Sequence, residues 1–99
     1  MSYTYRQGTL PATTPTVVYT CPSGKTALIQ SVRVNNPAAY VFTLNKHDYG
    51  DGTTQIYQLT LSAGDTVTDQ NPMVLRPNDY IELVSSVVGT NYVLSIIEY

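Results

Sequence analysis

Apolar and polar residues alternate with a period of two along most of this chain. In the segment YVFTLNK (40–46), Tyr40, Phe42 and Leu44 share one parity while Val41 and Thr43 share the other. The segment QIYQLTLS (55–62) repeats the pattern. Successive side chains of a β-strand point to opposite faces, so this alternation predicts strands with one face in a core and one towards solvent.

Turn signals divide the alternating segments at short intervals. The separators are CPSGK, NPAA, HDYGDGTT, AGD, NP, RPND and GTN. They leave expected strands at 16–20, 26–36, 40–46, 55–62, 66–70, 73–75, 80–88 and 92–99. No window has the apolar spacing of an amphipathic helix. The pattern therefore predicts an all-β fold: a two-layer antiparallel β-sandwich, jelly-roll or Ig-like, of seven to eight short strands.

One expected strand breaks the alternation. In 26–36, Ala27 and Ile29 have one parity, whereas Val32 and Val34 have the other. An extra residue in a strand reverses the facing of everything after it. We therefore predict a β-bulge near Gln30, which would bring all four apolar side chains to the same face.

The two ends of the chain differ from the rest. The last expected strand, 92–99, is apolar on both faces, and a two-layer domain has only one interior.

The first fifteen residues hold Pro11 and Pro15 around a Thr-rich spacer and show no regular alternation. They predict an extended N-terminal arm (1–15) before a single sandwich domain (16–99). Aromatic-bearing arms dock on the sheet edges of neighbouring subunits. The predicted assembly contacts are Tyr3, Tyr5, Leu10, Tyr92, Leu94 and Ile96. A disordered terminus and scattered exposed side chains without a role stay open as alternatives.

Composition limits the size and the partners of the protein. The 99 residues suit one domain. Charged residues make up 12% of the chain, roughly half of the usual share of about a quarter. The net charge of −2 gives no reason to expect nucleic acid or an anionic membrane as a partner. The opening residues lack the basic start and apolar run of a signal peptide, so we expect a soluble protein that is not secreted.

The triplet Gly24-Lys25-Thr26 resembles the end of a phosphate-binding loop. Such a loop needs a glycine five positions before the Gly-Lys pair, where Tyr19 stands, and a helix after it, where the chain is strand-like. We interpret Pro22-Ser23-Gly24-Lys25 as a tight turn instead, with proline at its second position and glycine supplying a positive φ.

The single cysteine, Cys21, is either a buried small side chain or an intermolecular bridge.

The segment 47–54 is the one candidate ligand loop. It holds His47, Asp48, Tyr49 and Asp51. The spacing of its carboxylates is not that of a calcium loop, and one imidazole with two carboxylates has no specific metal signature. No Gly-x-Ser-x-Gly motif occurs and the acidic residues are dispersed, so we expect no metal, no cofactor and no enzymatic activity.

The turns together resemble a known group of proteins. VVYTCPSGKTALIQSVRVNNP, LSAGDTVTD and MVLRPNDYIELVSS occur in that order and span most of 17–98. This succession is similar to that of small β-sandwich virion proteins of tailed bacteriophages. Where their later turn has glycine before the aspartate, this chain has Asn78, which also tolerates a left-handed conformation.

The resemblance implies a non-enzymatic virion structural protein, assembled in the host cytoplasm and present in many copies. It would act as a head decoration or cement protein, a neck or tail accessory subunit, or a fibre knob. Its partners would be copies of itself and other virion proteins. The alternative is a carbohydrate- or receptor-binding module of a host-attachment fibre, with Tyr49, Asp48 and Asp51 as its site.

Overall fold

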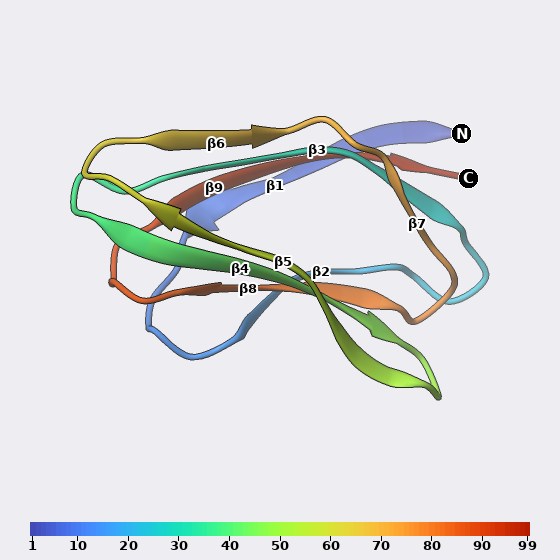
Figure 1. Cartoon of the computed structure of the whole chain (residues 1–99). Coiled ribbons are helices and arrows are strands. Elements are labelled where there is room, and N and C mark those ends of the chain that lie inside the picture. Colours follow the sequence, from blue (N-terminus) through green and yellow to red (C-terminus); the bar gives the residue numbers. More distant parts are fainter.

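A computed structural model describes all 99 residues of the chain, as nine β-strands in two layers (Figure 1). The strands are β1 (Ser2–Thr9), β2 (Thr16–Thr20), β3 (Ala27–Asn35), β4 (Tyr40–Asp48), β5 (Gly52–Leu61), β6 (Thr66–Asp69), β7 (Met73–Leu75), β8 (Tyr80–Ser85) and β9 (Asn91–Glu98). The all-β antiparallel sandwich is confirmed. No helix is long and apolar enough to cross a membrane.

The strand order makes the sandwich a jelly roll rather than an Ig-like fold. Sheet A has the order β1-β9-β3-β6, with β7 also on β3, and sheet B has the order β2-β8-β4-β5. Strands pair as in one long nested hairpin, β1 with β9, β2 with β8, β3 with β6 and β7, and β4 with β5. The hairpin is rolled up by two further pairs, β3 with β9 and β4 with β8. Consecutive strands therefore alternate between layers over much of the chain.

The bulge in β3 is where the sequence pattern places it. The register of β3 against β9 shifts between Ile29 and Ser31, so Gln30 is the extra residue. The four apolar residues on either side, Ala27, Ile29, Val32 and Val34, are all buried. They join the predicted core residues Tyr40, Phe42 and Leu44 of the opposite sheet in one core.

Two tight turns use backbone conformations that most residues avoid. Gly24 has φ 80° and Asn78 has φ 70°, as the turn chemistry predicts. The hydrogen bond of the first turn runs from the Lys25 N–H to the Pro22 carbonyl (3.2 Å). Pro22 is thus the first residue of this turn, not the second.

One end of the sandwich is closed by buried polar side chains. The Asn36 amide donates to the Val88 carbonyl (3.1 Å) and to the Thr90 hydroxyl (2.9 Å). The Thr90 hydroxyl donates in turn to Ser85 (2.7 Å). Because these groups satisfy one another, burying them carries little penalty, and they fix the β8–β9 turn against which Leu10 lies.

The N-terminal segment is not separate from the sandwich. Residues Ser2–Thr9 form β1, which pairs along its whole length with β9 of the same chain. The Leu10 N–H continues this ladder by donating to the Thr90 carbonyl (2.8 Å). The domain boundary predicted at residue 15 therefore differs from the structure. Backbone pairing on the β9 edge orders a segment whose side chains show no alternation.

Candidate assembly surface

The outer face of sheet A carries a row of apolar side chains near the two chain ends. Tyr3 pairs with Ile97, Ile97 with Leu28, and Leu28 with Val74, so one side chain from each of four strands stands in line. Tyr99 continues the outward parity of β9 and pairs with Thr26 through two backbone hydrogen bonds. The most open members are Tyr3 (71%), Val74 (56%) and Tyr99 (57%). Tyr5 (62%) stands two residues along β1, on the same face.

This row is an apolar surface on the outside of a sandwich. The two chain ends lie at the same end of the molecule (Figure 1). Tyr3, Val74 and Tyr99 are exposed, whereas Ile97 is buried (7%) and Leu28 is half-buried among them. Exposed apolar side chains grouped on one face of a small domain mark contact surfaces. We define Tyr3, Leu28, Val74, Ile97 and Tyr99 as the outer apolar row.

Of the six predicted assembly residues, three lie in the core of the single chain. Leu10, Leu94 and Ile96 are almost fully buried, so they are not surface contacts of this chain. Tyr92 is half-buried against the core. The inward parity of β9 explains this: residues 92, 94 and 96 face sheet B, whereas 93, 97 and 99 face outwards. Only Tyr3 and Tyr5 are exposed as predicted.

The inner face of β1 is polar. Its inward residues Thr4 and Arg6 pair with Ile96 and Leu94. The Arg6 guanidinium lies 5.3 Å from the centre of the Tyr19 ring, a cation–π arrangement. A Cβ at Gly8 would come within 3.1 Å of the Tyr92 hydroxyl, so the missing side chain leaves room for that ring.

Tyr19 links the two sheets beneath β1. Its hydroxyl donates to the Glu98 carboxylate of β9 (2.6 Å). Burial, and then the hydrogen bond and negative charge of Glu98, raise the pKa of the Tyr19 hydroxyl. The tyrosine therefore stays protonated and acts as a hydrogen-bond donor.

The predicted ligand loop is a tight hairpin tip. Strands β4 and β5 extend to Asp48 and from Gly52, which leaves only three residues between them. His47 stacks on Tyr80 with 4.3 Å between ring centres and shares a 2.8 Å hydrogen bond with Thr53. The Asp48 carboxylate pairs with Lys46 (2.7 Å).

The remaining loop residues do not converge with these two. Tyr49 is exposed, and the Asp51 carboxylate lies 3.7 Å from the Arg76 guanidinium. Adjacent strand residues His47 and Asp48 point to opposite faces of β4. The chain brings no three His, Cys, Asp or Glu side chains together as a metal site.

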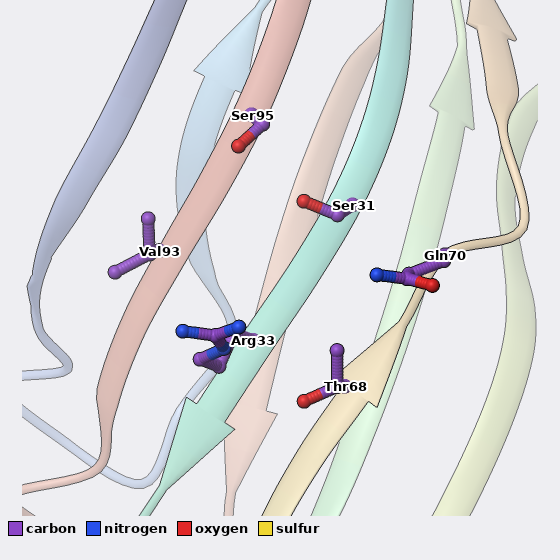
Figure 2. A pocket seen from close by; sticks show the side chains of 6 residues that line it. All are labelled: Ser31, Arg33, Thr68, Gln70, Val93 and Ser95. Atoms are coloured by element: carbon purple, nitrogen blue, oxygen red, sulfur yellow. The ribbon is translucent and has the colours of Figure 1, made fainter.

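A polar hollow of about 130 Å³ lies elsewhere, on the outer face of sheet A. Figure 2 shows Ser31 and Arg33 on β3, Val93 and Ser95 on β9, Thr68 on β6 and Gln70 just after the end of β6. The Arg33 guanidinium has no carboxylate partner. No local sequence pattern marks this hollow, because its residues come from three separate parts of the chain and meet only through the sheet register.

Cys21 is fully buried. Its thiol lies 3.3 Å from the Lys25 carbonyl, inside the first turn. Burial raises the pKa of the Cys21 thiol, with a smaller effect from Glu98. The structure thus favours the buried small side chain over an intermolecular bridge.

No protein-family model matches this chain, and no characterised protein matches it by sequence. A solved structure of Bacillus endospore appendages, a family of disulfide-linked pili, matches with a TM-score of 0.54 and 12% identity, over 99% of this chain and 84% of that chain. A structure of infectious bursal disease virus, Gx strain, matches with a TM-score of 0.36 and 10% identity, over 96% of this chain and 30% of that chain. At such identities the first match shows a shared β-sandwich fold.

Proposed function

We propose that this chain is a structural subunit of a tailed-bacteriophage virion. It decorates or stabilises the particle as a capsid decoration or cement protein, or as a neck or tail accessory subunit. In this proposal it is assembled in the host cytoplasm, acts through protein–protein contacts and catalyses no reaction.

The outer apolar row carries the proposal. Tyr3, Val74 and Tyr99 are more than half exposed and stand beside Leu28 and Ile97 on one sheet face. Covering such a face against another subunit removes apolar area from water, which is favourable by about 25 cal/mol per Å² before the costs of association. The order of the turn motifs supports the virion setting.

Self-association tests the surface directly. We expect the wild-type protein to form oligomers in size-exclusion chromatography with light scattering, and the double variant Tyr3→Ser/Val74→Ser to shift towards the monomer mass. Val88→Ser is the control. The exposed fraction of Val88 (60%) lies between those of Val74 and Tyr3, but Val88 is in the β8–β9 turn, outside the row. A wild-type protein that stays monomeric at every concentration would refute the assembly surface.

The virion setting needs a second measurement. Mass spectrometry of purified particles of the source phage should detect the chain in a stoichiometric, repeated number of copies. Its absence from the particles would contradict the proposed location even if the protein self-associates.

A carbohydrate-binding role is the second candidate, and the polar hollow favours it. An unpaired guanidinium among hydroxyl and amide groups suits an acidic sugar, because arginine binds a carboxylate with two parallel hydrogen bonds. We expect the wild-type protein to bind an acidic glycan in a glycan array, and the Arg33→Ala variant to lose that binding. Tyr49→Ala is the control, because Tyr49 belongs to the ligand loop 47–54 that the sequence predicts. If only Tyr49→Ala loses binding, the glycan site lies at the β4–β5 hairpin tip and not in the hollow.

A further inference from the structure

We propose that the segment Ser2–Leu10 is exchanged between copies of this chain, so that β1 of one copy pairs with β9 of a second copy. The inference deepens the proposed self-assembly and rests on it. It identifies the partner as a second copy and the contact as a sheet edge.

The place for an incoming strand is fully specified by the structure. β1 occupies the β9 edge over eight residue pairs, from Ser2 with Glu98 to Thr9 with Asn91. An identical segment from another copy would make the same pairs. Exchange of an identical element is a low-cost route to oligomers, because the contacts within one chain become contacts between two.

The hold of β1 on its own chain is mostly backbone pairing. Its inward side chains are polar or absent, as Thr4, Arg6 and Gly8 show, and most of its residues are exposed. When β1 leaves the sheet, few buried apolar side chains of β1 itself therefore become exposed to water. It does leave β9 with an open edge, which another strand can cover.

Leu10 gives the segment an anchor. Its side chain is almost fully buried in the core, and its backbone bonds to Thr90 (2.8 Å) and Gly89 (3.4 Å). An exchanged segment that ends in a leucine would fill the matching core site of its partner. The segment thus combines backbone hydrogen bonds to β9 with one buried apolar side chain.

The five residues that follow have the character of a hinge. Residues 11–15 make no backbone–backbone hydrogen bond, and proline stands at both ends. Proline disfavours tight, helical arrangements of the residue before it and promotes extended chain. Fully extended, five residues span up to about 17 Å, which lets β1 leave its own sheet without disturbing β2.

Exchange would also account for the residues that the sequence predicted as contacts between chains. All six, Tyr3, Tyr5, Leu10, Tyr92, Leu94 and Ile96, belong to β1, to its continuation, or to the strand it pairs with. Within one chain, the core placement of Leu10, Leu94 and Ile96 makes them unavailable to a partner. In an exchanged assembly the same buried contacts join two chains.

Cysteine trapping distinguishes the two arrangements, because Gln7 and Val93 are facing partners on β1 and β9. One preparation carries Gln7→Cys and a second, with a tag of different mass, carries Val93→Cys. The two are unfolded together, refolded, allowed to assemble and mildly oxidised. Facing strand residues meet the distance requirement for a disulfide. We expect a covalent heterodimer on a non-reducing gel, absent when Val93→Cys is replaced by Val88→Cys.

The double variant Gln7→Cys/Val93→Cys gives the complementary reading. In an exchanged assembly its disulfides link chains into covalent oligomers. Exchange is overturned if the assembled double variant contains intrachain disulfides only and the mixed single variants give no heterodimer beyond the control. Assembly without cross-chain disulfides would refute exchange alone, whereas a wild-type protein that never assembles would refute the proposed function as well.

Discussion

At the scale of single residues, Phe42 is the largest fully buried side chain and lies against the Tyr57 ring, 6.1 Å between ring centres. We expect Phe42→Ala to lower the free energy of unfolding by about 3–5 kcal/mol, through lost burial and the cavity left behind. Tyr49→Ala removes an exposed aromatic ring and should change it by less than about 0.5 kcal/mol. Chemical denaturation of both variants provides the measurement. Equal effects would place Phe42 outside the core.

Asp79 is a buried carboxylate that holds two turns together. It accepts the backbone N–H groups of Tyr49 (2.8 Å) and Arg76 (2.9 Å). Burial alone would raise the pKa of this carboxyl, but these hydrogen bonds and the charges of Arg76 and Lys46 outweigh it and hold the pKa below its ordinary value.

This lowered pKa makes stability depend on acidity. Above the unfolded value of about 3.9, the carboxylate contributes fully; as the pH falls further, the unfolded chain takes up the proton first and the contribution is lost. We expect Asp79→Asn to lose about 1–3 kcal/mol at neutral pH and to show a smaller further loss on acidification than the wild type. Urea unfolding at a series of pH values tests this, and parallel curves would contradict it.

At the scale of elements, the first turn depends on Gly24. Its φ of 80° is unfavourable for other residues, and a Cβ there would touch nothing within 4 Å. Gly24→Ala should therefore destabilise by about 1–2 kcal/mol through the backbone alone. Asn78→Gly, at the other left-handed position, is the matched comparison and should be close to neutral. Thermal unfolding of the two variants checks the contrast, which equal melting temperatures would deny.

Sequence patterns located the elements from Thr16 onwards well, and failed where pairing rather than side chains made the strand. The bounds of β2 and β7 agree with the expected segments. The hairpin of β4 and β5 is longer than expected, because His47 and Asp48 pair with Thr53 and Gly52 across a region that reads as loop. β1 was missed as part of the sandwich for the same reason: its order comes from the β9 edge.

At the scale of the whole molecule, truncation separates the strand from its anchor. Deleting Met1–Thr9 should leave a folded sandwich that no longer self-associates, since the strand is mainly exposed. Deleting Met1–Pro15 also removes Leu10, which should cost a further loss of about 2–5 kcal/mol, as for other buried leucines. Circular dichroism melts and light scattering of both truncations test this. If the variant that lacks Met1–Thr9 self-associates as strongly as the wild type, β1 is not the contact between subunits.

The sequence by itself determined the all-β class, the core parity of most strands and the bulge at Gln30, because strand side chains alternate and a bulge reverses that alternation. Tertiary structure alone decided the jelly-roll order, the place of β1 and the two outer surfaces. The outer apolar row and the Arg33 hollow are built from residues distant in sequence. Their side chains become neighbours only when hydrogen bonding fixes the register between strands, and no local pattern encodes that register.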